Sequence, residues 1–166
     1  MNYHAIGYHG TSKVGANEIL SNGIDFGRRS GDVFLGCGFY VWRDSVERAK
    51  AWNSSESVIE IILECNHDEM LNFTSMNWNN ERYIMKLYFD DFLPKKIYFG
   101  EFIDFLIANG VDIKLVSILD LKNRKTLLPI QDPIFSTDKT IFSYGDIQIC
   151  IKSQNVVKSI FERNVV

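Results

Sequence analysis

The sequence has little cysteine, little proline and no long hydrophobic run, and each shortage argues against a class of protein. Three cysteines are spread over 166 residues without a C-x-x-C pair, so we expect no structural zinc site and no other metal. Three free thiols are typical of a reducing compartment. No stretch approaches the roughly 18 apolar residues that a membrane-spanning helix needs, and the N-terminus lacks the segments of a signal peptide. We expect a cytoplasmic protein with no membrane partner.

Basic residues are not in excess either. The 18 Lys and Arg residues stand against 21 Asp and Glu residues, for a formal charge of −3. Because a broad nucleic-acid-binding surface usually carries excess positive charge, this balance weakens that class and leaves only a small local groove open. The composition is otherwise that of an ordinary globular protein, with 46% hydrophobic and 23% charged residues. The length suits a single domain over residues 1–166.

Short apolar runs alternate irregularly with helical patterns along the chain. Residues 5–10 predict a buried strand, Thr11 or Ser12 can cap the helix that follows, and Gly23 ends it. The clearest strand is expected at residues 57–65, with Glu60, Ile62 and Glu64 on one face and Ile59, Ile61 and Leu63 on the other. The two glutamates are expected to face solvent. Further strands are expected at residues 33–35, 38–42, 113–121 and 147–151, and helices at 46–52, 81–92, 98–109 and 155–163. The pattern predicts an α+β fold with a mostly antiparallel or split sheet.

Two motifs near the start of the chain carry the most specific signal. Residues 8–12 (Tyr-His-Gly-Thr-Ser) place a His-Gly pair at the end of a strand, and residues 36–41 (Gly-Cys-Gly-Phe-Tyr-Val) place a glycine-flanked aromatic strand about one helix later. Together with Ala49 and Trp52 they resemble the His-Tyr-Glu class of ADP-ribosyltransferases, the diphtheria-toxin and poly(ADP-ribose)-polymerase type, and most closely its small bacterial toxin-type members. Residues 148–152 are similar to the family's third motif. The resemblance implies an ADP-ribosyltransferase-like split β-sheet core with flanking helices.

The resemblance also implies NAD as a co-substrate, held by its nicotinamide amide and both riboses. His9 would hydrogen-bond a ribose hydroxyl through either neutral tautomer. Gly10 has no side chain, so its backbone would approach the carboxamide closely. Thr11 and Ser12 would offer hydroxyls to the nearby ribose. Arg28, in the loop at residues 26–32, would bind the dinucleotide phosphates or the acceptor.

Aromatic side chains are expected on both sides of the nicotinamide ring. Tyr40 would stack on the ring from a strand whose close turn Gly36 and Gly38 permit, and Trp52 would form the opposite wall. The alternative is that Tyr40 and Trp52 are core aromatics in a chain that is 13% aromatic. His9 could likewise be a core histidine with its hydrogen bonds satisfied.

The third motif departs from the family pattern. Family members place a Glu there to bond the nicotinamide ribose and stabilise oxocarbenium charge, whereas this chain has Gln148. A Gln amide accepts a hydrogen bond but supplies no negative charge, and electrostatic stabilisation is often the largest catalytic contribution. Asp146 lies two residues earlier, on the same face of an extended strand, and is the candidate substitute acid.

The function implied by the resemblance is transfer of ADP-ribose to an intracellular macromolecule (protein, DNA or RNA) with release of nicotinamide. The resemblance to small toxin-type members suggests that this protein is a toxin in a toxin–antitoxin or phage-defence module, with an antitoxin protein as a candidate partner. Two alternatives stay open. The protein could be a non-catalytic sensor of NAD or ADP-ribose, which the Gln at position 148 favours, or an NAD glycohydrolase in which water replaces the acceptor.

Overall fold

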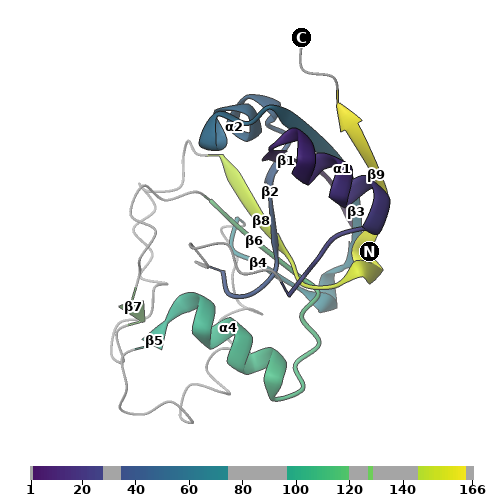
Figure 1. Ribbon diagram of the computed structural model, residues 1–166. Coiled ribbons are helices and arrows are strands. Elements are labelled where there is room, and N and C mark those ends of the chain that lie inside the picture. Colours follow the sequence, from purple (N-terminus) through teal and green to yellow (C-terminus); the bar gives the residue numbers. More distant parts are fainter. Residues whose placement is uncertain (1, 28–34, 75–96, 120–126, 129–145, 164–166) are drawn as a thin grey trace.

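Seven of the described strands form one sheet, in the order β4-β6-β8-β2-β1-β3-β9 (Figure 1). The computed structural model describes residues 2–27, 35–74, 97–119, 127–128 and 146–163. The strands are β1 (Asn2–Thr11), β2 (Phe39–Arg43), β3 (Ser57–Asn66), β4 (Met70–Asn72), β6 (Leu115–Leu119), β8 (Ile147–Ile151) and β9 (Val157–Arg163). Neighbours in this sheet are antiparallel except β4 and β6, which run parallel. A separate antiparallel pair joins β5 (Ile97–Tyr98) to β7 (Leu127–Leu128).

The described α-helices are α1 (Lys13–Asn22), α2 (Val46–Ala51) and α4 (Phe99–Ala108). Both N-terminal helices begin at a serine whose side-chain oxygen accepts a backbone N–H: Ser12 caps α1, and Ser45 caps α2. Short 3₁₀ turns lie at η1 (Trp52–Ser54), η2 (His67–Glu69) and η4 (Gln154–Val156). Figure 1 shows α4 and α1 on opposite sides of β6 and β8. No helix within the described ranges is long and apolar enough to cross a membrane.

The centre of the sheet has a weak junction between β1 and β2. β1 pairs with β3 over all ten of its residues, from Asn2 to Thr11. It pairs with β2 at two positions alone, where Gly7 faces Arg43 and Tyr8 faces Trp42. Beyond Tyr8 the two strands therefore diverge, and the sheet consists of two halves, β9-β3-β1 and β2-β8-β6-β4, joined by this short contact.

Three apolar clusters pack the helices onto the sheet. On the side of α4 that faces the sheet, Phe102 and Leu106 are fully buried against β6 and β8. Beneath α1, Ala16 packs with inward side chains of β3 such as Ile59 and Ile61. α2 is seated through Ala49, which packs in a third cluster with Tyr8, Trp42 and Val58. Each helix thus covers a different part of the sheet.

Several predicted elements are confirmed, and the structure differs from the prediction at Leu35 and at residues 155–163. An α+β structure with a mostly antiparallel sheet is present, and α1 begins at Ser12 and ends at Gly23 as expected. In β3, Ile59, Ile61 and Leu63 are buried, as the alternation predicts. The helix expected at 81–92 and residues 33–34 lie outside the described residues, while Leu35 lies in a turn. The prediction of one domain over residues 1–166 stays a prediction.

The segment predicted as a helix over residues 155–163 is instead the turn η4 followed by strand β9. β9 pairs antiparallel with β3, with Ile61 facing Ile160 and Val58 facing Arg163. The local spacing of Val156, Val157 and Ile160 suits a helix. The edge of β3 offers a full row of backbone partners, and this pairing overrides the local preference.

Candidate functional site

His9 lies on β1 just beyond the last pair with β2, and its ring reaches across the divergence. Its Nδ1 lies 2.8 Å from the Tyr40 carbonyl oxygen, and its ring centroid lies 4.2 Å from that of Phe39. A carbonyl oxygen only accepts, so Nδ1 carries the proton and Nε2 is the acceptor of the neutral ring. Burial lowers the pKa of His9, against the smaller opposite effect of the Tyr40 carbonyl. The imidazole is therefore neutral near pH 7, with one fixed tautomer.

The three residues after His9 have structural roles in this fold. A Cβ at Gly10 would overlap the Ala49 carbonyl oxygen and the Ser55 hydroxyl, so glycine at this position permits α2 to lie directly on β1. The Thr11 hydroxyl faces Gly15 in the first turn of α1, where a Cβ would also overlap it. The Ser12 hydroxyl accepts the Gly15 N–H at 3.1 Å as the cap of α1.

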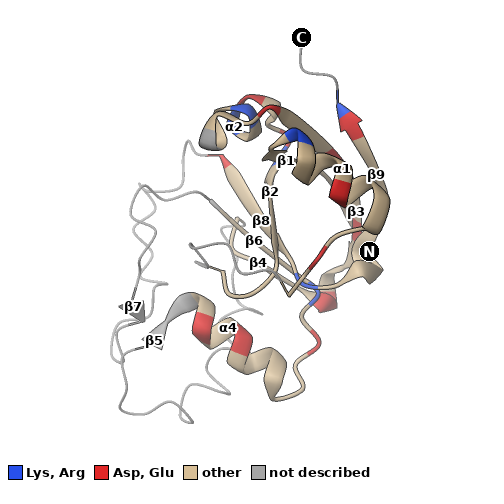
Figure 2. Ribbon diagram, viewed as in Figure 1, with Lys and Arg blue, Asp and Glu red and all other residues tan. Residues whose placement is uncertain are grey.

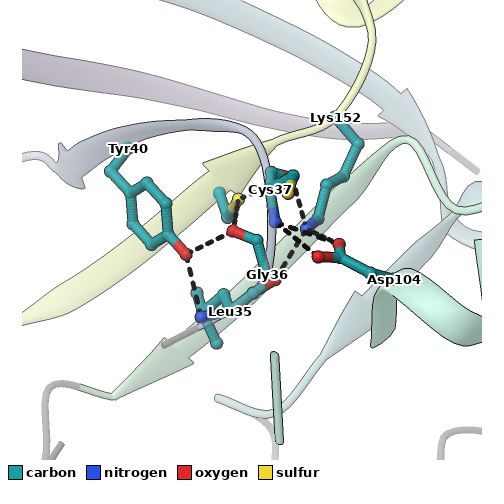
Figure 3. Close-up of polar contacts among 7 residues, drawn as sticks. Leu35, Gly36, Cys37, Tyr40, Asp104 and Lys152 are labelled. Carbon is teal, nitrogen blue, oxygen red and sulfur yellow. Dashed lines mark hydrogen bonds and ion pairs between the residues drawn. The ribbon is translucent and has the colours of Figure 1, made fainter. Parts of the chain in front are cut away.

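Tyr40, predicted to stack on nicotinamide, has its hydroxyl tied to the loop that precedes β2 (Figure 3). The hydroxyl accepts the Leu35 N–H at 2.9 Å and donates to the Gly36 carbonyl at 2.7 Å. Burial raises the pKa of Tyr40 far above its usual value, so the hydroxyl stays protonated. A Cβ at Gly38 would collide with the Cys150 sulfur, so glycine there lets the chain approach β8. The Tyr40 ring packs against the cluster beneath α4.

Gln148, the third-motif residue, lies on β8 between β2 and β6. It faces Trp42 on one side and Ile118 on the other, and it is only 7% exposed. Because residues directly opposite in a sheet point to the same face, Gln148 shares its face with Trp42 and, two residues along β2, with Tyr40. The structure thus brings the second and third motifs onto one face of adjacent strands.

Asp146 precedes β8 and forms an ion pair with α2. Its Oδ2 lies 2.8 Å from Arg48 Nε, with the two side chains 42% and 41% exposed. The Arg48 guanidinium lies over the Trp42 ring, 4.6 Å from its centroid. Trp42 in turn contacts Trp52 at 6.0 Å between ring centroids and an interplanar angle of 56°. The carboxylate proposed as a substitute acid therefore lies beside a cation that stacks on a tryptophan.

Trp42 and Arg48 are central residues of this arrangement, and neither was predicted as a site residue from the sequence. A signal for Trp42 is present in the sequence: it stands two residues after Tyr40 on a strand and must share its face. Arg48 has no comparable signal. Arg28 lies outside the described residues.

The predicted residues form two groups. Tyr40, Gln148, Asp146 and Trp52 gather around Trp42 on one face of the sheet. His9 points to the other face, because its neighbour Tyr8 faces Trp42 and successive strand residues alternate. The hydrogen bond from His9 to the Tyr40 carbonyl connects the two groups across the diverging strands.

Charges of both signs are distributed over the described elements. Figure 2 shows residues of both signs on α1 and near the end of β9, and acidic residues on α4. A polar cavity of about 260 Å³ lies elsewhere, between the start of β1 and the end of β3. Its lining includes Glu64, Glu69 and Lys114 but none of the motif residues. The described residues hold no cluster of three His, Cys, Asp or Glu side chains suited to a metal ion.

Comparisons of the chain with models of protein families, with curated proteins and with solved structures found no match.

Proposed function

We propose that this protein binds NAD where β1 and β2 diverge and transfers ADP-ribose to an intracellular protein or nucleic acid. The observation that carries the proposal is the tautomer of His9. Its Nδ1–H is directed to the Tyr40 carbonyl, so Nε2 is the acceptor, as a ribose hydroxyl donor requires. The divergence of two half-sheets beside a His-Gly strand end is consistent with the ADP-ribosyltransferase-like split sheet that the motifs suggest.

The reaction breaks the bond between ribose C1′ and the nicotinamide nitrogen. The electron pair of that bond leaves with nicotinamide, positive charge builds on the ribose, and the acceptor nucleophile attacks C1′ and loses its proton. Gln148 lies on the opposite face of the sheet from His9, so it would accept a hydrogen bond from a ribose hydroxyl only of an NAD molecule that enters between the diverging strands. Asp146, directly before β8, would be the candidate carboxylate. Since Arg48 already pairs with Asp146, its negative charge is partly compensated, which predicts a modest rate.

A non-catalytic sensor of NAD or ADP-ribose is the second candidate. It is favoured by the uncharged Gln148, which is buried on its strand, and by the ion pair of Asp146 with Arg48. A sensor binds NAD without releasing nicotinamide. An NAD glycohydrolase would release nicotinamide from purified protein alone and leave no labelled macromolecule.

The test incubates the purified protein with labelled NAD and a cell lysate separated into protein, DNA and RNA fractions. His9→Ala is the test variant. His4→Ala is its matched control, since His4 is an exposed histidine on the same strand. Label in one fraction that is lost in His9→Ala and kept in His4→Ala would support transfer and identify the acceptor class. NAD binding with neither label nor free nicotinamide would support the sensor, and no NAD binding would reject both.

A toxin role is part of the proposal and has its own consequence. Expression of the active chain would harm the host cell, and His9→Ala would relieve the harm. An antitoxin protein would be the partner that suppresses it. Harm that persists in His9→Ala would contradict an NAD mechanism.

A further inference from the structure

Lys152, which directly follows β8, carries a buried ammonium group surrounded by acceptors. Its side chain is 4% exposed. Its Nζ lies 2.6 Å from the Leu35 carbonyl, 2.6 Å from the Cys37 carbonyl and 3.2 Å from Asp104 Oδ1. An ammonium group has three N–H donors, so these acceptors account for all of them. Two of the three belong to the loop that opens β2.

Asp104, on α4, binds the same loop through a backbone N–H group. The Cys37 N–H donates to both carboxylate oxygens, at 3.0 and 2.9 Å. Gly36 has a φ of 81° and lies so close to the carboxylate that a Cβ would overlap it. The loop therefore folds around a carboxylate supplied by the helix, and glycine is required for the approach.

Tyr40 completes the set of contacts from within β2. Its hydroxyl bridges the Leu35 N–H and the Gly36 carbonyl (Figure 3). Its own carbonyl accepts a hydrogen bond from His9. The loop at residues 35–38 is thus held by Lys152, which follows β8, by Asp104 of α4 and by Tyr40 of β2. A continuous series of hydrogen bonds leads from Lys152 and Asp104 through this loop and Tyr40 to His9.

We propose that Lys152 and Asp104 are positioning residues that hold the loop at residues 35–38, and through Tyr40 fix His9 for NAD. The NAD part of this inference rests on the proposed function. The pair connects α4, which carries none of the motif residues, to the divergence of β1 and β2. Neither residue needs to touch NAD for its removal to weaken binding.

The test uses Asp104→Ala and the neutral double variant Asp104→Ala/Lys152→Met. The double variant leaves no unpaired buried ammonium, so loss of fold is separated from loss of positioning. Matched controls are Glu101→Ala, which removes an exposed carboxylate from the same helix, and Lys158→Met, which removes an exposed lysine from β9. Hydrogen exchange of the Leu35 and Cys37 amides reports on the loop, and NAD affinity reports on the site.

We expect both test variants to stay folded, to exchange the two amides about tenfold faster or more, and to bind NAD about tenfold more weakly, with the controls unchanged. Unchanged amide exchange in both test variants would overturn the inference, and so would faster exchange with undiminished NAD affinity. Absence of NAD binding by the unaltered protein would reject the proposed function instead, while the exchange rates would still decide whether the pair holds the loop.

Discussion

The two halves of the sheet use polar groups in opposite ways. On β9-β3-β1 the ion pairs lie at the surface: Arg163 lies 3.1 Å from Glu60, and Lys158 lies 3.6 Å from Glu64, with both basic side chains 50% exposed. Apolar side chains are exposed there too, with Phe161 at 51% and Ile62 at 37%. This half is held by long backbone pairing, ten residues between β1 and β3.

On β2-β8-β6 the polar contacts around Lys152 are buried, while the ion pairs Arg48–Asp146 and Arg43–Asp44 lie at the surface. Residues 148–151 of β8 are all buried, and Lys152 is 4% exposed with its partners in a loop and a helix. Solvent screens a surface ion pair and makes it worth little, whereas a buried donor that loses its partner has no water to replace it. We therefore expect the stability of the second half to depend more on individual polar residues than that of the first.

The largest effect is expected where α2 lies on β1, in Gly10→Ala. The new Cβ would overlap the Ala49 carbonyl and push α2 off β1, so we expect a loss of stability of about 3 kcal/mol or more. Denaturant unfolding measures it. Gly27→Ala is the control, because Gly27 is exposed and a Cβ there approaches only the Asp25 carboxylate at 3.3 Å. Equal losses of stability in the two variants would show that the contact between α2 and β1 is not tightly packed.

The second-largest effect is expected when the buried hydrogen bonds of Lys152 are removed. Lys152→Met removes the donor of the Leu35 and Cys37 carbonyls, and buried acceptors without partners cost about 1–3 kcal/mol. We expect Lys152→Met to lower the free energy of unfolding by about 2 kcal/mol, with the melting temperature as a second measure. A loss no larger than that of Lys158→Met would remove the distinction between the two halves.

The third effect is a dependence of the stability on pH, which arises from His9. Burial lowers the pKa of His9 in the folded protein, so below about pH 6.5 the unfolded chain binds a proton that the folded protein does not. The stability therefore falls as the pH drops from about 6.5 toward the folded-state pKa, by at most about 1.4 kcal/mol per pH unit from this group. Denaturant unfolding between about pH 5 and 8 measures the slope. His9→Gln should lose this contribution and His4→Gln should keep it. The same slope in all three proteins would contradict a partly buried His9 that stays neutral in the folded protein.

The smallest effect is expected on the outer strand. Arg163→Ala removes the ion pair with Glu60 and a hydrogen bond to the Tyr8 hydroxyl. Because the arginine side chain is half exposed, we expect a loss of stability below about 1 kcal/mol. Added salt should reduce the difference from the unaltered protein further. A loss equal to that of Lys152→Met would mean that the outer half also depends on single polar residues.

Much of the local structure could be predicted because neighbouring residues determine it. Ser12 and Gly23 bound α1 since the cap oxygen and the glycine act within one helical turn. The inward isoleucines of β3 follow from strict alternation. The motif residues of β2 and β8 were placed on strands correctly, and the register puts Gln148 beside Trp42 and diagonal to Tyr40.

The contacts of the candidate site could not be predicted in the same way. Nothing near Asp146 indicates that Arg48 will pair with it, and nothing near Asp104 indicates that it will accept the Cys37 N–H, which lies 67 residues away. The pairing of β9 with β3 likewise joins segments about a hundred residues apart, and it overrides a helical spacing.

The sequence by itself determined the class of the fold, some element boundaries such as those of α1 and β8, and the residues worth testing, because caps, turns and alternation depend on neighbours in the chain. Only the tertiary structure decided that β1 and β2 separate after Tyr8, that His9 donates to the Tyr40 carbonyl and that Lys152 lies buried among loop carbonyls. These features depend on which distant strands share a sheet. Hydrogen bonds between such segments form only once folding has brought them within about 3 Å of one another.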